Sequence, residues 1–342
     1  MSEEETKFED DISNLVNDIF EREEEEGKKQ LEKVIRINLL GNVNTGKSTT
    51  INALIGKDKL HTHVNPGETV SVTEVPHPEN NNVLFVDTPG LKDMDEKNSA
   101  KALKKLKSAD VVLYFLNAEG VSLGNEELNT LNKISRRNKN IIVVLNKIDG
   151  IEQNDISLLK RYVEKTIEDR YKVIPISAIT GENVEELNAI ILEYLSKEGK
   201  DILFAKSMKT KSASAYKWIY AASISAGAIG ALPVPGSDIA PLTTLQVSLI
   251  VKLSLLYDKP ITKDATTKIV VSTIAGGLGQ TVFRQGVKFF PGIGMIIGAS
   301  VAGTVTFGLG QAVKYALEND IEITPDQLKE ITDSFSTKTK EN

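Results

Sequence analysis

The sequence predicts a three-layer α/β domain with a mostly parallel sheet, followed by an all-α domain. Between residues 33 and 200, short β-branched apolar runs alternate with helical patterns, as is typical of buried parallel strands joined by helices. Beyond residue 200, long uncharged stretches rich in glycine and alanine begin. The length of 342 residues suits about two domains.

The chain begins with an acidic segment, residues 1–32, that we expect to be a helix and a linker. Apolar residues recur there at helical spacing, with acids on the other face, which predicts an amphipathic helix over residues 5–26. The run Glu23–Gly27 predicts a solvated linker. The apolar stripe either docks on another domain, or it makes this segment a dimerisation or regulatory helix. Binding to a membrane is disfavoured, because anionic lipids would repel the acidic face.

The α/β domain is expected to span residues 33–200. Buried strands are predicted at 34–40, 83–87, 111–116, 141–145 and 173–176, and an antiparallel edge strand at Val70–Val75. Helices are predicted at 48–55, 97–107, 125–136, 154–169 and 184–195. The ligand of such a domain should lie at the carboxyl ends of its strands.

The loop after the first predicted strand has the pattern Gly-x4-Gly-Lys-Ser, from Gly41 to Ser48. This is the P-loop signature, in which backbone N–H groups converge on an anion at a helix N-terminus. We expect Lys47 to contact the β- and γ-phosphates, and the Ser48 hydroxyl to ligate Mg²⁺. The other residues of this loop assigned to the nucleotide are Asn42, Asn44, Thr45, Gly46 and Thr49.

Three more motifs follow predicted strands. In Asp87-Thr-Pro-Gly90, the Asp87 carboxylate can hold Mg²⁺ and the Gly90 N–H can meet the γ-phosphate. In Asn146-Lys147-Ile-Asp149, the Asp149 carboxylate can accept hydrogen bonds from the ring N–H and the exocyclic amine of guanine. The last motif, Ser177-Ala178, can close over the base edge through its backbone.

The ordered set GNVNTGKS, DTPG, NKID and SA resembles the translation-factor-related class of P-loop GTPases, nearest to the Era-like branch, over roughly residues 34–198. The resemblance implies Mg²⁺-dependent hydrolysis of GTP to GDP and phosphate, with Lys47, Thr69 and Gly90 as catalytic residues. It also implies Ser48, Thr69 and Asp87 as the metal ligands. Thr69 is the expected first-switch threonine, and Thr73 is the fallback.

Two residues bear on the source of catalysis. Leu91 stands where Ras-type enzymes have the glutamine that orients the attacking water. Stabilisation must then come from a partner, a second subunit or a cation. Asn44 stands where related K⁺-activated GTPases hold potassium, although an asparagine there can also simply stabilise the loop. Both residues suggest a homodimer through the nucleotide-binding faces.

The all-α domain is expected at residues 201–317, with a short helix and tail at 318–342. Residues 218–237 and 289–313 carry no charge, and the domain holds eleven bases against four acids. Two interpretations are open. The domain is either a soluble or peripheral helical bundle that packs through small residues, or a set of helices that span a membrane or insert into it conditionally. The aromatic residues Trp218 and Tyr220 beside preceding lysines are typical of a membrane surface. For the final helix, over residues 324–335, Thr324 is the expected N-cap.

This domain is similar to an uncharacterised helical domain that follows bacterial Era-like GTPases, over roughly residues 205–317. The overall order of parts also resembles the immunity-related and dynamin-like GTPases. We expect the GTPase to act as a nucleotide-dependent conformational switch, with the helical domain as its effector. The alternatives are a GTPase that binds or remodels membranes, and a GTP- or GDP-binding module with negligible turnover.

Composition limits the remaining function classes. The chain has no cysteine, which excludes thiol catalysis and disulfides and suits the cytoplasm, at a membrane surface or free of one. Nothing resembles a basic surface interleaved with aromatic residues, so we expect no DNA partner. The expected ligands are guanine nucleotide and Mg²⁺, with K⁺ as a further candidate.

Overall fold

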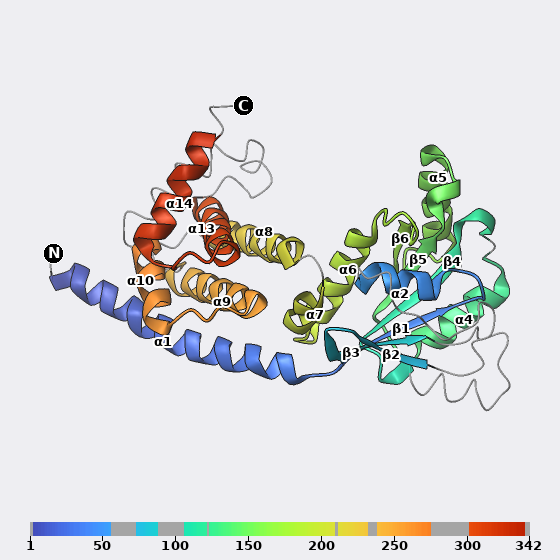
Figure 1. Ribbon diagram of the computed structural model, residues 1–342, viewed down its shortest axis with the longest axis horizontal. Helices are drawn as coiled ribbons and strands as arrows, with labels where there is room; N and C mark the ends of the chain where they lie inside the picture. The colour runs from blue at the N-terminus through green and yellow to red at the C-terminus, as the bar shows by residue number, and fades with distance from the viewer. Residues whose placement is uncertain are drawn as a thin grey trace. The chain divides into compact units, whose positions relative to one another are not determined.

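The computed structural model describes residues 3–55, 73–87, 106–121, 123–208, 211–231, 238–274 and 301–338. Two compact units make up the chain (Figure 1). One is the α/β unit, Glu32–Lys209, and the other is the helical unit, formed by Met1–Leu31 together with Thr210–Asn342. The first helix therefore belongs to the same unit as the last helices.

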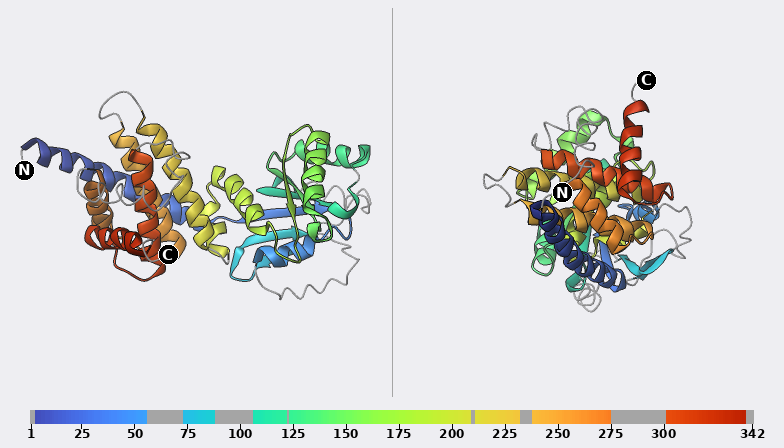
Figure 2. Two further views of the ribbon diagram at one scale, coloured as in Figure 1. Left: turned by 90° about the horizontal axis from the view of Figure 1, so that it is seen from above. Right: turned by 90° about the vertical axis from the view of Figure 1, so that its left-hand side faces the viewer.

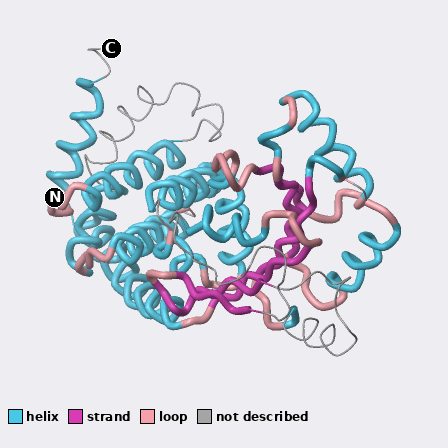
Figure 3. The backbone as a smooth tube through the Cα atoms, turned by 45° about the vertical axis from the view of Figure 1, so that its right-hand side comes forward, coloured by secondary structure: helices cyan, strands magenta, loops and turns pink. Residues whose placement is uncertain are grey.

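The α/β unit contains one six-stranded sheet with the order β2-β3-β1-β4-β5-β6, drawn in magenta in Figure 3. The strands are β1 (Ile35–Gly41), β2 (Thr73–His77), β3 (Asn80–Asp87), β4 (Val111–Asn117), β5 (Ile141–Asn146) and β6 (Lys172–Ile176). All neighbours are parallel except β2 and β3. The predicted mostly parallel sheet with an antiparallel edge strand is confirmed. Residues 70–72 of that predicted edge strand lie outside the described residues.

Helices connect or follow these strands. They are α2 (Lys47–Ile55), α4 (Asn125–Ser135), α5 (Gln153–Thr166), α6 (Val184–Lys197) and α7 (Asp201–Ser207), with short 3₁₀ turns η1 (Ala118–Gly120) and η2 (Ile148–Gly150). Leu131 of α4 and Val163 of α5 pack with Val143 in one buried cluster on the sheet. Most of the helix predicted at 97–107 lies outside the described residues. The unit continues past residue 200 because α7 buries Leu203 and Phe204.

Helix α1 (Glu3–Glu32) runs through the segment that we expected to be a linker. That prediction is wrong, because lysines one turn later offset the acidic run: Lys28 pairs with Glu24 at 2.8 Å and Lys29 with Glu25 at 2.6 Å. The apolar stripe of α1 is buried within the helical unit, with Val16 fully inaccessible to solvent. Docking on the rest of the chain thus accounts for the stripe.

The helical unit also contains α8 (Lys211–Ile229), α9 (Ile239–Tyr257), α10 (Lys263–Ile274), α13 (Val301–Glu318) and α14 (Pro325–Lys338), seen in two further views in Figure 2. Helices α8, α9 and α13 pack against one another. Gly310 of α13 permits close approach: a Cβ there would lie 2.8 Å from Ile219 Cγ1 and 3.1 Å from Leu249 Cδ2. The expected N-cap of α14 is confirmed, since Gln327 N–H donates to Thr324 Oγ1 at 3.2 Å.

One of the described helices, α9, is long and apolar enough to cross a membrane, with a mean hydropathy of 1.7. More than half of its apolar window, 56%, is buried inside the structure. Trp218, one of the aromatic residues on which the membrane alternative depends, is 8% exposed in the structure. It packs inside the unit, with Lys252 Nζ 4.3 Å from its ring centroid.

The close packing at Gly310 predicts the effect of Gly310→Ala. The added methyl group overlaps Ile219, so we expect a loss of about 1–3 kcal/mol in the free energy of unfolding, although alanine normally stabilises a helix relative to glycine. Urea unfolding followed by the fluorescence of Trp218, the only tryptophan in the chain, measures this. Ser225→Ala on the exposed face of α8 is the control. A Gly310→Ala variant as stable as the unsubstituted protein would contradict the packing.

Candidate nucleotide-binding site

The predicted site residues gather at the carboxyl edge of the sheet. Strand β1 lies between β3 and β4, so the chain leaves β1 towards one side and later returns to the other. Such a switch point is where open α/β sheets bind ligands. Asp87 ends β3 and pairs in register with Leu39 of β1, and Asn146 ends β5.

The loop between β1 and α2 is shaped by close backbone approaches. Gly41 has φ +149°, and a Cβ there would lie 2.7 Å from the Phe115 carbonyl oxygen. Gly46 has φ +84°, and a Cβ there would lie 2.1 Å from Asn146 Nδ2. Asn44 is left-handed with φ 63°, a conformation that asparagine tolerates. Both signature glycines are therefore required by contacts as well as by backbone conformation.

Lys47 begins α2 and reaches back over this loop. Its Nζ donates to the carbonyl oxygens of Gly41 and Asn42, each at 3.0 Å. The ammonium group therefore lies over the loop that the signature assigns to phosphates. Its positive charge also acts on Asp87 at the end of the neighbouring strand.

Ser48 and Asp87 are two of the residues predicted to ligate Mg²⁺, and they contact each other. Ser48 Oγ donates to Asp87 Oδ2 at 3.1 Å. Burial raises the pKa of Asp87, while the Lys47 charge and the Ser48 hydrogen bond oppose that rise. Asp87 Oδ1 is buried and accepts no hydrogen bond from the described part of the chain. A buried carboxylate oxygen without a partner, beside a hydroxyl, fits a Mg²⁺ ion that takes its remaining ligands from phosphate and water.

Asn146 links two loops of the site. Its Nδ2 donates to the Thr45 carbonyl at 2.8 Å, and its Oδ1 accepts from Ala178 N–H at 3.1 Å. The side chain is 2% exposed. Asn146 therefore holds the P-loop and the loop after β6 at a fixed separation, a structural role that the sequence pattern did not specify.

Asp149 lies on η2, exposed to solvent. The buried Ser177 hydroxyl donates to Asp149 Oδ1 at 2.7 Å and accepts from Thr180 N–H at 3.1 Å. One carboxylate oxygen is thus fixed by the loop after β6, and the group still has acceptor sites for a ligand. This arrangement preorganises the carboxylate before any base arrives.

Lys147 has a charged neighbour, Glu119, that no sequence motif indicates. Lys147 is left-handed with φ 71°, and its Nζ lies 3.8 Å from Glu119 Oε2. Glu119 sits on η1, where its N–H donates to the Asn117 side chain. The available signal was its position directly after strand β4, at the same edge of the sheet as the other motifs.

The structure brings together every predicted site residue that it describes: 42, 44–49, 87, 146, 147, 149, 177 and 178. The predicted residues Thr69 and Gly90 lie outside the described residues, as does Leu91. Within the described ranges, no group of three or more histidine, cysteine or acidic side chains is placed to hold a metal. A cation at Ser48 and Asp87 would therefore need ligands from outside this set.

Part of the chain is similar to known proteins. A family model described as 50S ribosome-binding GTPase matches residues 36–147. The chain is similar to GTPase Era of Aquifex aeolicus, with 34% identity over 191 residues, or 52% of this chain and 62% of that protein. It is similar to GTPase Der of Coxiella burnetii, with 31% identity over 53% of this chain and 43% of that protein. The chain thus spans less than two thirds of these relatives.

Among solved structures, the chain resembles Era in complex with MgGDPNP and nucleotides 1506–1542 of 16S ribosomal RNA. The identity is 32%, the match covers 47% of this chain and 57% of that chain, and the TM-score is 0.40. A structure of a point variant of Aquifex aeolicus Era bound to GDP.AlF4- matches with the same coverage, identity and TM-score.

The buried Asp87 carboxylate generates a prediction about Asp87→Asn. Because burial raises the pKa of Asp87 in the folded protein, folding disfavours the ionised carboxylate. The ionised group therefore lowers the free energy of unfolding at high pH, and this loss disappears as pH falls through the raised pKa. We expect the nucleotide-free variant to melt higher than the unsubstituted protein at pH 8, with a gap that narrows towards pH 5. Mg²⁺ should no longer tighten GDP binding.

Melting curves and GDP titrations with and without Mg²⁺ measure both effects. Asp155→Asn, on the exposed face of α5, controls for the loss of one charge. A variant that melts lower at neutral pH and still responds to Mg²⁺ would contradict the assignment.

The segment that the family model matches contains the P-loop with its two glycines and the Ser48–Asp87 pair. It also contains Asn146, which bonds the P-loop to the loop after β6. The α/β unit thus contains a P-loop GTPase domain, which the family model matches over residues 36–147 and which is similar in sequence to GTPase Era and GTPase Der.

Proposed function

We propose that this chain binds GTP with Mg²⁺ and hydrolyses it to GDP and phosphate. The observation that supports this proposal most directly is that Lys47, the Ser48–Asp87 pair and Asp149 lie at one edge of one sheet. Each is held by its own hydrogen bonds. The names of the relatives, GTPase Era and GTPase Der, support the activity. Because the chain spans only part of those proteins, the activity of the whole chain is our inference.

On the phosphate side, Lys47 donates to two neutral acceptors, the Gly41 and Asn42 carbonyls. Phosphate oxygens are stronger acceptors for an ammonium group, because hydrogen bonds between charged partners are roughly twice as strong as neutral ones. Ser48 and Asp87 would hold Mg²⁺, which supplies charge stabilisation as phosphate leaves. The N–H groups at the start of α2 add positive potential at the same point.

On the base side, Asp149 would select guanine. Its carboxylate can accept from the ring N–H and the exocyclic amine, a donor pair that adenine lacks. A hydrogen bond to a charged group contributes about 1.5–3 kcal/mol, and an unpaired acceptor penalises the wrong base. Ser177 fixes the orientation of the carboxylate.

Leu91 cannot orient a water molecule, so the stabilising group for hydrolysis would come from a cation or a second subunit. Asn44 is exposed on the P-loop with φ 63°, where its side chain is open to a K⁺ ion beside the phosphates. A homodimer through the nucleotide-binding faces would supply the group in another way. Both proposals make hydrolysis conditional, as a switch requires.

Single-turnover hydrolysis of GTP tests the activity. Lys47→Ala should slow phosphate release by about 10- to 150-fold, since it removes a charge-assisted contact of roughly 1.5–3 kcal/mol. Lys133→Ala on α4 is a control outside the site. Rates in KCl and NaCl over a range of protein concentrations separate the potassium and dimer proposals. Unchanged turnover in the Lys47→Ala variant would contradict the proposed role of this site in GTP hydrolysis.

We also propose that the helical unit is the effector of the nucleotide cycle. The unit has its own core, and its only tryptophan, Trp218, contacts Lys252 of a different helix. A change in the packing of α8 against α9 would change the surroundings of that ring. The fluorescence of Trp218 therefore reports on the helical unit alone.

We expect the spectrum of Trp218 to differ between the GDP-bound protein and the protein bound to a non-hydrolysable GTP analogue. Lys252→Met, which keeps the aliphatic packing and removes the charge over the ring, should reduce that difference. ADP and a non-hydrolysable ATP analogue are the controls. Identical spectra in both guanine nucleotide states would contradict an effector role that involves this helix pair.

A further inference from the structure

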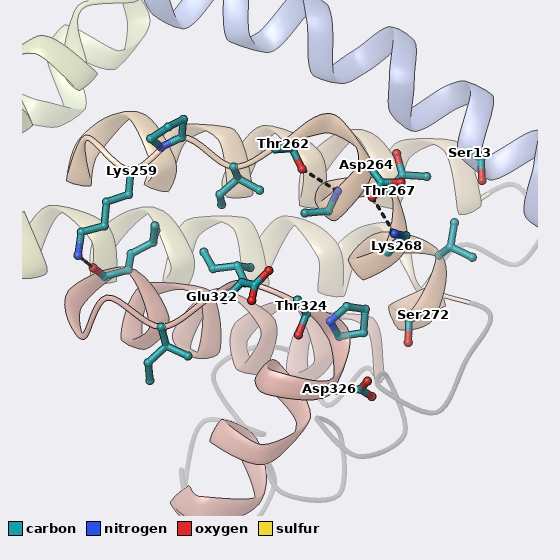
Figure 4. Close-up of a pocket in the computed structure, with 18 of the residues that line it drawn as sticks. Ser13, Lys259, Thr262, Asp264, Thr267, Lys268, Ser272, Glu322, Thr324 and Asp326 are labelled. Atoms are coloured by element: carbon teal, nitrogen blue, oxygen red, sulfur yellow. Dashed lines mark hydrogen bonds and ion pairs between the residues drawn. The ribbon is translucent and has the colours of Figure 1, made fainter.

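The helical unit contains a cavity of about 1140 Å³ that the nucleotide cycle does not use. Within the described part of the chain, three segments line it: the first half of α1, helix α10 with the turn before it, and the connection from α13 to α14 (Figure 4). Its volume is above the usual range of small-molecule pockets, roughly 300–1000 Å³. The cavity therefore has room for a ligand larger than a metabolite.

The side of the cavity formed by α1 is held in place by two contacts. Lys263 pairs with Glu21 at 2.8 Å, and Thr267 Oγ1 donates to Asn17 Oδ1 at 3.3 Å. These contacts place α1 antiparallel to α10. Further along both helices, Ser13 and Val271 line the cavity.

Part of the lining is apolar. It comprises Pro260, Ile261, Ala265, Val271, Leu317, Ile321, Ile323 and Pro325. Ile261 and Ile323 remain 8% and 9% exposed, so they belong to the core and still border the cavity. Aliphatic side chains of a ligand would lose water on contact with this surface.

The charged part of the lining is acidic. Its described residues include six carboxylates and two lysines, and each lysine is already neutralised: Lys259 pairs with Asp320 at 2.6 Å and Lys268 with Asp264 at 2.7 Å. The other four carboxylates have no cationic partner among the described residues; these are Glu9 and Asp10 on α1, Glu322 before α14, and Asp326 on α14.

We propose that this cavity is a docking site for a basic amphipathic peptide segment of a partner protein. Aliphatic side chains of the segment would contact the isoleucines and prolines, and its lysines or arginines would pair with the carboxylates of α1 and of the α14 end. An anionic lipid, a nucleotide or RNA would be repelled by the same groups. The site goes beyond the proposed GTPase activity and uses no residue of the nucleotide site.

The test uses the whole 342-residue chain without nucleotide and a fluorescent 14-residue peptide of leucine and lysine, patterned as an amphipathic helix. The cavity variant is Glu9→Gln, Asp10→Asn, Glu322→Gln and Asp326→Asn together. The matched control is Asp11→Asn, Asp18→Asn, Glu330→Gln and Asp333→Asn, which removes the same charge from α1 and α14 at positions that do not line the cavity. Circular dichroism confirms that both variants are folded.

We expect saturable one-to-one binding that weakens about tenfold or more in the cavity variant and less than twofold in the control. A peptide with glutamate in place of lysine should not bind. The proposal is overturned if the peptide fails to bind, or if both variants lose affinity equally. It is also overturned if a leucine-free lysine peptide of equal charge binds as tightly, because general attraction to an acidic surface would then explain the result. GTP hydrolysis should be equal in all three proteins, so failure of this site and failure of the GTPase assignment are distinguishable.

Discussion

The nucleotide site depends on the amide side chain of Asn146. This side chain bonds the Thr45 carbonyl on one side and the Ala178 N–H on the other. It is buried at the end of β5, two strands away from β1, so one residue sets the distance between the phosphate end and the base end of the site. The contact also explains Gly46, since a Cβ there would lie 2.1 Å from the same amide. Loss of Asn146 would leave two buried backbone groups without partners, which costs about 1–3 kcal/mol each.

The rest of the site combines a largely apolar scaffold with polar groups at its edge. The central strands are buried on both faces, which fixes the backbone at the point where each strand ends. At that edge the fold tolerates an incompletely bonded carboxylate, Asp87, whose burial raises its pKa. A group that costs stability in the free protein and fits a cation is typical of functional sites.

Much of the α/β unit could be predicted from the sequence, because its signals are local. Apolar runs such as residues 141–145 are long enough and β-branched enough to specify buried strands, and the glycine–lysine loop directly precedes a helix. The unit against which α1 packs could not be predicted, because an apolar stripe does not indicate which surface buries it. The helix also continues through Glu23–Gly27, where ion pairs one turn apart offset the acidic run. Glu119 carries no motif of its own, and only the neighbouring strand ends place it beside Lys147.

The central claim is that a carboxylate and a lysine at one sheet edge together select and hold guanosine triphosphate. Displacement of a fluorescent GDP analogue by unlabelled nucleotides tests it most directly. The account predicts that GTP and GDP displace the analogue at concentrations at least about 100-fold below those of ATP and ADP, and that replacing Asp149 with alanine removes most of this difference. Equal displacement by ATP and GTP in the unsubstituted protein would contradict the account.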